Sequence, residues 1–385
     1  MVRTQVNHRG LRTWLEIDTA AIKHNLNLFR RAAPTGVKLL GVVKSNAYGH
    51  GLIGFSRLLA DWGIDWLGVD SVVEAIALRR AGIKTPVLVF GYTLPENFSR
   101  AARLGITLTI SSLESLKALL AARGARPAIQ LKVDTGMHRQ GFGREDFAAA
   151  LKLIKGRPVR VVGLYSHLAA ASTQRLSDFT HEQEKEFIFF RAALGAERRG
   201  PMLYHLAASG GIISNELDGE YNLIRLGLGM YGLWTTPELC RRRGAHWPLC
   251  PVLVWKTIIG EVKRLPVGGG IGYGLTKKLP PGAVVAICPI GYWHGYPCAL
   301  SNHSSVAIRG QLAPVVGRVS MDMLIIDVSR LGKVEVGDEV ELIGPHVSAE
   351  TLALQARTSP HEIITRLNPL IEKFYFQNKN PVRQK

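Results

Sequence analysis

The sequence VKLLGVVKSNAYGHG, residues 37–51, contains the clearest transition from strand to turn in this chain. Its first half is a continuous apolar run, which is typical of a strand buried on both faces of a parallel sheet. Its second half is a polar turn with two glycines, and Lys44 stands where the run meets the turn. We therefore expect a buried strand that delivers Lys44 to one edge of a parallel sheet.

Similar apolar runs recur between about residues 14 and 235, and helical patterns separate them. In SSLESLKALLAARG (residues 111–124), leucines recur at helical spacing, and Ser111 with Glu114 predicts a capping box. The expected strands are residues 14–18, 37–46, 66–71, 86–92, 107–112, 128–136, 159–167, 204–209 and 223–232. About eight repeats of strand and helix predict a (β/α)8 TIM barrel, with a doubly wound open sheet as the alternative.

The pattern changes after residue 250. Strand-like runs such as VLVWKTIIGEVKRL (residues 252–265) follow one another with frequent turn signals and little helix between them. A final helix is expected near residues 359–374. The α/β chain thus divides into a barrel domain at residues 12–245 and a mainly β C-terminal domain at residues 246–378.

The composition fits two globular domains. The chain has 385 residues, of which 46% are hydrophobic and 20% are charged. No apolar stretch reaches the roughly 18 residues of a membrane-spanning helix, and the basic opening segment lacks the apolar core of a secretory signal. We expect a cytoplasmic protein that makes no membrane contact.

The formal net charge of +18 raises the question of a nucleic-acid partner. The basic residues are spread along the chain in short clusters such as residues 241–243, and no helix-turn-helix, zinc-finger or aromatic RNA-binding signature accompanies them. A basic surface that attracts anionic substrates, or a generally basic proteome, explains the charge without a nucleic acid. The four cysteines show no CxxC pair and no histidine at metal-ligand spacing, so we expect reduced thiols and no metal site.

In a barrel, functional groups gather at the carboxyl ends of the strands. Lys44 follows such an end and is suited to Schiff-base chemistry, although surface lysines are also common there. Further strand ends supply groups that bind anions or exchange protons, and glycines that let backbone N–H groups approach a phosphate. These residues are Lys132, Asp134, Arg139, Tyr165, Ser166, His167, Ser209, Arg225, Gly227 and Gly229. Together they predict a phosphate cradle, a carboxylate clamp and an Arg–His pair around the lysine.

Six ordered motifs carry a resemblance to a known family. They are WLEIDTAAIKHNL (14–26), VVKSNAYGHG (42–51), LKVDTGMHR (131–139), HLAAS (205–209), RLGLGMYG (225–232) and GRVSMDM (317–323). The second resembles the cofactor-lysine signature of the alanine racemase family, which usually has alanine where this chain has Ser45. The resemblance implies a fold-type III racemase that uses pyridoxal 5′-phosphate to interconvert L-alanine and D-alanine for peptidoglycan synthesis.

The resemblance also implies which barrel residues bind the cofactor. Lys44 resembles the lysine that holds pyridoxal phosphate covalently. Tyr48 is similar to a tyrosine that contacts the phosphate, and Ser209 with the backbone at Gly227 and Leu228 is similar to the rest of the phosphate site.

Four further barrel residues resemble family residues around the cofactor ring and the substrate. Arg225 is similar to the arginine that hydrogen-bonds the pyridine nitrogen, and His167 to the histidine beside it. Arg139 resembles an arginine on the substrate side, and Lys132 the lysine that is carbamylated in many members and orients that arginine. An arginine at the pyridine nitrogen does not protonate the ring, which weakens the electron sink and limits side reactions.

The C-terminal domain is expected to complete the site across a subunit boundary. Tyr273 resembles the family's catalytic tyrosine, Tyr292 a tyrosine at the site entrance, and Met321 with Asp322 a pair that contacts substrate. In this family the partner subunit supplies these residues, so a homodimer is implied. Racemisation needs an acid/base group on each face of the substrate, which the resemblance assigns to Lys44 on the D-face and Tyr273 on the L-face.

Several positions depart from the family pattern. His294 and Cys298 replace an acid and an arginine, Ser320 replaces a cysteine, and Pro369 stands about where a tyrosine is usual. The catalytic pair is unaffected, whereas substrate breadth and subunit contacts are less constrained by the resemblance.

Three alternatives remain open from the sequence. A broad-specificity or serine racemase would keep the cofactor and change the substrate. A pyridoxal-phosphate carrier without catalysis would usually be a barrel alone, which the C-terminal domain argues against. A nucleic-acid-binding module predicts salt-dependent binding to DNA or RNA and no visible absorbance from a cofactor.

Overall fold

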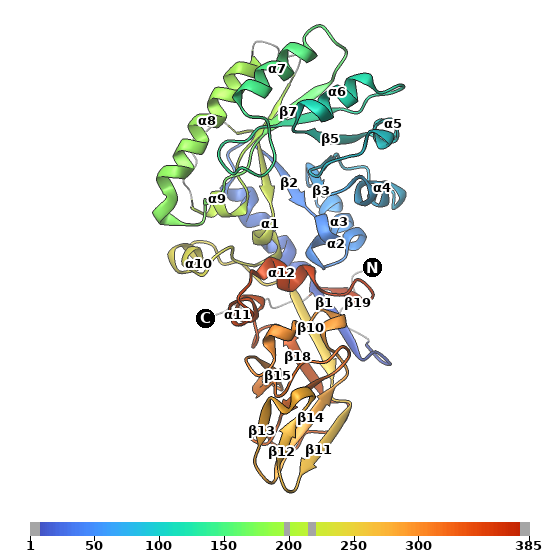
Figure 1. The fold of residues 1–385 in the computed structure, drawn as a ribbon, viewed down its shortest axis with the longest axis vertical. Coiled ribbons are helices and arrows are strands. Elements are labelled where there is room, and N and C mark those ends of the chain that lie inside the picture. Colours follow the sequence, from blue (N-terminus) through green and yellow to red (C-terminus); the bar gives the residue numbers. More distant parts are fainter. Residues whose placement is uncertain (1–7, 196–200, 215–220, 378–385) are drawn as a thin grey trace.

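The computed structural model describes residues 8–195, 201–214 and 221–377 of the chain. Figure 1 shows a barrel with surrounding helices at one end of the molecule and a β-rich part at the other end. Within these described residues, none of the helices is long and apolar enough to cross a membrane.

Eight parallel strands form the barrel. They are β2 (Lys38–Val42), β3 (Trp66–Val69), β4 (Val87–Val89), β5 (Ile106–Ile110), β6 (Ile129–Lys132), β7 (Val161–Tyr165), β8 (Leu203–His205) and β9 (Leu223–Leu226). Their spatial order is β8-β7-β6-β5-β4-β3-β2-β9. Two backbone hydrogen bonds join the ends of this order, from Asn222 N–H to Tyr204 O (3.2 Å) and from Arg225 N–H to Ala207 O (3.2 Å). The predicted barrel is therefore confirmed, and the open sheet is not formed.

Helices cover the barrel from outside (Figure 1). They include α1 (Thr19–Ala32), α3 (Leu52–Asp61), α4 (Val72–Arg80), α5 (Phe98–Arg103), α6 (Leu113–Ala121), α7 (Arg144–Ile154), α8 (Ser177–Gly195), α9 (Ser209–Ser214) and α10 (Pro237–Arg243). The capping box predicted for α6 is wrong by one residue. Ser112 has extended backbone and is the N-cap, so Ser115 rather than Glu114 returns the second hydrogen bond.

The C-terminal part is mainly β, as predicted. Its largest sheet contains, in spatial order, β16 (Gln311–Pro314), β15 (Ser305–Ile308), β18 (Glu339–Ile343), β10 (Leu253–Ile258), β1 (Thr13–Asp18) and β19 (Glu372–Phe376). A second sheet contains β11 (Glu261–Leu265), β14 (Ala283–Cys288) and β17 (Leu324–Asp327). A separate hairpin pairs β12 (Gly269–Ile271) with β13 (Lys277–Leu279).

Strand β1 corrects the predicted composition of the barrel domain. We expected it among the barrel strands, but it pairs antiparallel with β10 and parallel with β19 in the six-stranded sheet. Five of its six residues are buried, so its apolar character resembles that of a barrel strand and did not distinguish the two sheets. The predicted bounds, 12–245 and 246–378, otherwise stay predictions.

The helix expected at residues 359–374 is too long. The structure has α11 (Ala349–Gln355), then α12 (Pro360–Thr365), and β19 occupies the end of the predicted range. Asn368 precedes Pro369, and a residue before proline is biased away from helical backbone. Helix α12 has already ended at Thr365, and the proline disfavours further helix before β19 returns beside β1 as a strand.

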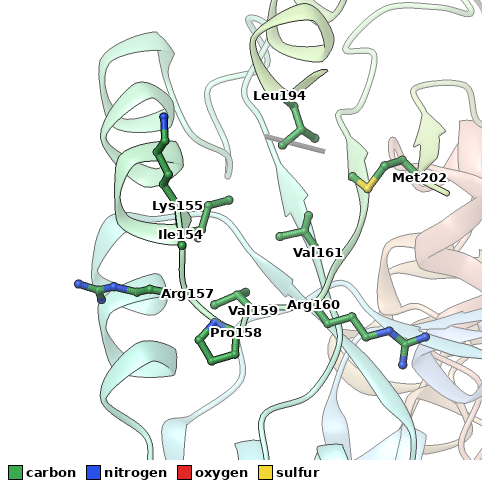
Figure 2. A pocket seen from close by; sticks show the side chains of 10 residues that line it. Ile154, Lys155, Arg157, Pro158, Val159, Arg160, Val161, Leu194 and Met202 are labelled. Carbon is green, nitrogen blue, oxygen red and sulfur yellow. The ribbon is translucent and has the colours of Figure 1, made fainter. Parts of the chain in front are cut away.

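Two cavities lie at the amino ends of the barrel strands. Figure 2 shows the smaller one, of about 340 Å³, which Arg160, Met202 and several apolar side chains line. The larger one, of about 620 Å³, shares Arg160 and Met202 with it and adds Lys38 and Lys84. Among the residues that the structure describes, no aspartate or glutamate lines either cavity. Part of the positive charge is thus concentrated at the end of the barrel that is usually associated with stability rather than catalysis.

Candidate active site

A cavity of about 530 Å³ lies at the carboxyl ends of the barrel strands. Parallel strands bring these ends to one edge, so residues that are far apart in the sequence meet there. Of the predicted site residues, the cavity is lined by Lys44, Tyr48, Lys132, Arg139, Tyr165, His167, Ser209, Arg225, Gly227 and Leu228. The barrel half of the predicted site is therefore assembled in one place.

Lys44 begins an unusual backbone segment, α2 (Lys44–Tyr48). Residues 45–48 all have φ between 51° and 57°, which makes this segment a turn of left-handed helix. For L-residues this conformation costs about 1–2 kcal/mol per residue, so surrounding contacts must enforce it. The Lys44 side chain is 40% exposed, and its Nζ lies 3.9 Å from Oδ1 of Asp70.

The C-terminal part of the chain holds this turn in place. The Tyr375 hydroxyl on β19 donates to His50 O (2.6 Å) and lies 3.1 Å from Gly51 O. Gly49 has a φ of +83°, and a Cβ there would collide with the carbonyl of Ile364 on α12. A glycine is required at this position by both the backbone conformation and the close approach of α12.

One wall of the cavity has the chemistry of a phosphate cradle. Burial raises the pKa of the Tyr48 phenol to about 12, so its hydroxyl stays neutral and can donate a hydrogen bond. Ser209 Oγ accepts from Gly227 N–H (2.9 Å), and a Cβ at Gly227 would lie 3.5 Å from the Tyr48 hydroxyl. A phenol, a serine hydroxyl and the backbone of a glycine-containing turn thus meet at one point.

Arg225 on β9 is buried, and five hydrogen bonds fix its guanidinium group. Three are donated to backbone carbonyls, those of Ser166 (2.8 Å), Leu206 (2.7 Å) and His205 (3.2 Å). Two reach ring nitrogens, from Nη1 to His205 Nδ1 (2.7 Å) and from Nη2 to His167 Nδ1 (3.0 Å). Burial lowers the pKa of Arg225 to about 10, which leaves it charged at neutral pH.

These bonds determine the protonation of both histidines. A guanidinium only donates, so His167 and His205 accept through Nδ1 and carry their proton on Nε2. Burial and the Arg225 charge lower the pKa of both rings, so both are neutral. His205 Nε2 donates in turn to Gln130 Oε1 (2.6 Å). His167 lines the cavity, and its Nε2–H is the proton that it can donate to a ligand.

Lys132 lies among other cations. Its Nζ donates to Gln140 Oε1 (3.0 Å). Burial, followed by the charges of Arg139 and Arg225, lowers the pKa of Lys132 to about 8. About one-tenth of this amine is therefore unprotonated at pH 7, and only the unprotonated amine reacts with carbon dioxide.

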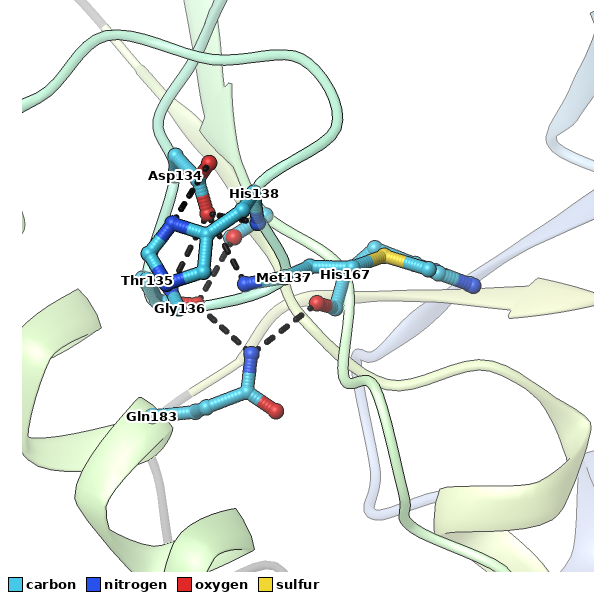
Figure 3. A network of polar contacts seen from close by, with 8 residues as sticks. Asp134, Thr135, Gly136, Met137, His138, His167 and Gln183 are labelled. Atoms are coloured by element: carbon cyan, nitrogen blue, oxygen red, sulfur yellow. Dashed lines mark hydrogen bonds and ion pairs between the residues drawn. The ribbon is translucent and has the colours of Figure 1, made fainter.

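A polar network positions the loop after β6 (Figure 3). Asp134 Oδ1 accepts from the backbone N–H groups of residues 136–138 at 2.9–3.1 Å, which closes a tight turn. Gln183 of α8 joins this turn to the end of β7, because its Nε2 donates to Thr135 Oγ1 (3.2 Å) and His167 O (3.3 Å). The loop that carries the cationic side chains and the strand end that carries the histidine are thus fixed to each other.

The predicted C-terminal residues lie outside this cavity. Tyr273 is 72% exposed, Met321 is 54% exposed and Tyr292 is 46% exposed, and Asp322 is exposed as well. Tyr273 follows β12, which lies at the end of the molecule opposite the barrel (Figure 1). Within one chain, the expected catalytic pair of Lys44 and Tyr273 is therefore not brought together.

One departure from the family pattern, Ser45, lines the cavity, whereas His294, Cys298 and Pro369 do not. His294 is buried and accepts Gly291 N–H through Nδ1 (3.2 Å). The exposed Cys298 places its thiol 3.6 Å from Val319 O. Pro369 is exposed beyond α12 and does not line the cavity within one chain, so its effect on substrate range stays a prediction.

Several residues of this region were not predicted, and three of them bear on the chemistry of the site. His205 and Gln130 extend the hydrogen bonds of Arg225 away from the cavity. His361 on α12 lines the cavity, with its ring centroid 5.7 Å from that of Tyr48. His205 begins the HLAAS motif and could have been found there. His361 lies far beyond the last barrel strand in the sequence, and no motif there indicates that it approaches the barrel.

Two family profiles match the chain. The profile described as "Alanine racemase, N-terminal domain" matches residues 17–235. The profile described as "Alanine racemase, C-terminal domain" matches residues 252–375. The two matches together cover most of both parts of the fold.

Named proteins and solved structures agree with these profiles. The alanine racemase of Symbiobacterium thermophilum is 36% identical over 379 residues, which cover 95% of this chain and 98% of that protein. Alanine racemase 2 of Bacillus subtilis is 34% identical over 379 residues and 95% of each chain. The alanine racemase structure from Clostridium difficile has a TM-score of 0.89 at 29% identity over 98% of each chain. The alanine racemase of Bacillus anthracis with bound L-Ala-P has a TM-score of 0.85 at 31% identity over 92% of each chain.

Proposed function

The chain belongs to the alanine racemase family, and from this we propose that it interconverts L-alanine and D-alanine with pyridoxal 5′-phosphate bound at Lys44. The observation that carries the proposal is the meeting of Lys44, Tyr48, Ser209 and Arg225 around one cavity at the carboxyl end of the barrel. In the cell, the reaction would supply D-alanine for peptidoglycan from the cytoplasm.

The residues present fit this cofactor. Tyr48 and Ser209 supply hydroxyl groups where a phosphate would bind, together with the backbone at Gly227 and Leu228. Arg225 can donate to the pyridine nitrogen and cannot protonate it, because its guanidinium keeps its proton at neutral pH. A cavity of about 530 Å³ is within the usual range for small-molecule sites. When bound, the cofactor supplies the electron sink that makes the α-hydrogen of alanine acidic.

Two side chains would move the α-proton, one on each face of the substrate. Lys44 Nζ would act on one face and the phenol of Tyr273 of the partner subunit on the other. Free phenols are protonated at neutral pH, so a tyrosine base needs a stabilised phenolate. The Nε2–H of His167 would supply a hydrogen bond to that phenolate, and the charge of Arg225 behind the ring favours it.

We propose that a homodimer completes the site. Four large apolar side chains of the C-terminal domain are each at least 55% exposed, namely Tyr273, Leu275, Trp293 and Met323. Exposed apolar side chains of this size are consistent with an interaction surface on this domain. A second copy that placed this surface over the barrel would bring the missing phenol to the Nε2–H of His167.

We expect Lys132 to be carbamylated. Its lowered pKa supplies the neutral amine, and the resulting anion would relieve the repulsion among Lys132, Arg139 and Arg225. Protein incubated with ¹³C-bicarbonate should give a carbamate carbon signal by NMR. That signal should be lost in Lys132→Ala and kept in Lys152→Ala, which removes an exposed lysine of α7. An absence of the signal from the unaltered protein would contradict the assignment.

The proposed function is tested by a visible spectrum and an enantiomer assay on purified protein. Added pyridoxal 5′-phosphate should give a visible absorbance band, and L-alanine should be converted to an equal mixture of enantiomers. Parallel assays with serine and lysine measure the substrate range, which we expect to favour alanine. A protein that formed no visible band, or that left L-alanine unchanged, would overturn the proposal.

A further inference from the structure

His361 lies in the active-site cavity and has no part in the mechanism proposed above. It stands in the first turn of α12, which packs against α2, the segment that carries Lys44. Its ring contacts the Tyr48 ring at a centroid distance of 5.7 Å and an interplanar angle of 41°. The same cavity contains Ser209 and Gly227, so the imidazole shares the space above the phosphate cradle.

The charges around His361 are mainly positive. On α2 it faces Lys44 and Tyr48, and Lys132 and Arg139 line the same cavity. On its own helix, Glu362 pairs with Arg366 at 3.1 Å, and on α11 the carboxylate of Glu350 accepts Trp234 N–H at 3.3 Å. These two carboxylates are thus engaged with other groups. The charge that acts on the His361 ring is that of Lys44. The surrounding protein and the Lys44 charge both lower the pKa of His361.

We propose that His361 is a contact of the cofactor phosphate and takes up a proton from solvent when that phosphate binds. The inference rests on the proposed function, because it needs a phosphate in the cradle. A phosphate dianion beside Tyr48 would make the surroundings of the His361 ring anionic instead of cationic. A nearby negative charge favours the positively charged imidazolium form of the ring. The protonated ring then donates a charge-assisted hydrogen bond, which is stronger than one from a neutral group.

The proton uptake gives the binding a definite pH dependence. A ligand whose binding takes up a proton loses affinity as the pH rises between the pKa of the free protein and that of the complex. The affinity of the unaltered protein should therefore fall with rising pH relative to that of His361→Gln, by at most about tenfold per pH unit. Near neutral pH, His361→Gln should bind roughly tenfold more weakly, because the charge-assisted bond is lost.

The probe is pyridoxine 5′-phosphate, which carries the phosphate and ring but no aldehyde, so that Lys44 chemistry does not contribute. Calorimetric titrations in two buffers of different protonation enthalpy give the number of protons taken up per bound ligand. We expect the unaltered protein to take up more protons than His361→Gln, by at most about one. His361→Phe, which keeps the ring contact with Tyr48, should behave like His361→Gln. The matched control is His181→Gln, an exposed histidine of α8, which should behave like the unaltered protein.

The outcomes separate this inference from the proposed function. Equal proton uptake and equal affinity in the unaltered protein and in both His361 variants would overturn the role of His361. In that case the visible band formed with pyridoxal 5′-phosphate would still support the cofactor assignment at Lys44. If the unaltered protein formed no such band, the proposed function would fail first.

Discussion

Lys44→Ala loses racemisation by at least about 10³-fold and holds no covalently attached cofactor. In the proposed mechanism the side chain both attaches the cofactor and acts as the base on one face of the substrate, so one substitution would remove two functions. Borohydride reduction of the unaltered protein with pyridoxal 5′-phosphate, followed by peptide mass spectrometry, should place the label on Lys44. Lys38→Ala is the matched control, because Lys38 is an exposed lysine at the opposite end of the same strand.

Lys132 is the competitor that this experiment must distinguish. It lines the same cavity, and burial together with the charges of Arg139 and Arg225 lowers the pKa of its amine to about 8. A label on Lys132 in the unaltered protein, or an undiminished visible band in Lys44→Ala, would contradict the assignment. The left-handed turn after Lys44 and the cradle formed by Tyr48 both favour the labelling of Lys44.

Tyr273→Phe keeps the visible band and loses racemisation by about 10²–10⁴-fold. The two enantiomers have equal free energies in water, so kcat/KM must fall equally in both directions. The asymmetry should appear in hydrogen exchange instead. Lys44 should still exchange the α-hydrogen of D-alanine with deuterated solvent, whereas the α-hydrogen of L-alanine should be retained. Tyr204→Phe, which removes a phenol hydroxyl of β8 outside the cavity, is the control. Rapid exchange from L-alanine would show that Tyr273 is not the second base.

Mixed dimers test whether the two groups come from different chains. A heterodimer of Lys44→Ala and Tyr273→Phe chains, purified through two different tags, would hold one site with both changes and one site with neither. It should recover about half the activity of the unaltered dimer, since one of two sites is intact. A heterodimer as inactive as its parents would mean that each site uses a single chain, which the distance of β12 from the barrel in Figure 1 argues against.

The barrel and most of its site were predictable because they depend on local patterns. Strand-like runs carry Lys44, Lys132 and Arg225 at or near their ends, and a parallel barrel brings all strand ends to one edge. The roles of these side chains came from the family resemblance. The β1 strand shows the limit of this reasoning. Burial on both faces is compatible with either sheet, and only pairing with β10 and β19 decides between them.

Other features depended on contacts that no local pattern contains. The left-handed backbone of residues 45–48 leads directly into residues 49–51, which Tyr375 and the close approach of α12 at Gly49 contact from outside. A sequence can show that glycines flank this turn, but it does not show that the intervening residues also have positive φ. His361 was missed for a similar reason, because its helix joins the cavity only through the packing of α12 on α2.

Strand β1 also sets an order of events during synthesis. Its residue Trp14 lies opposite Lys256 on one side and Glu372 on the other, so both neighbours leave the ribosome long after β1 itself. The eight barrel strands lie between them in the sequence and pair with one another without its help. The barrel can therefore close on a growing chain while β1 is still without its partner strands β10 and β19. The hydrogen bond from Tyr375 to His50 O forms only when β19 has been synthesised. The turn that follows Lys44 therefore becomes rigid, and ready for its cofactor, only after translation has passed the end of the fold.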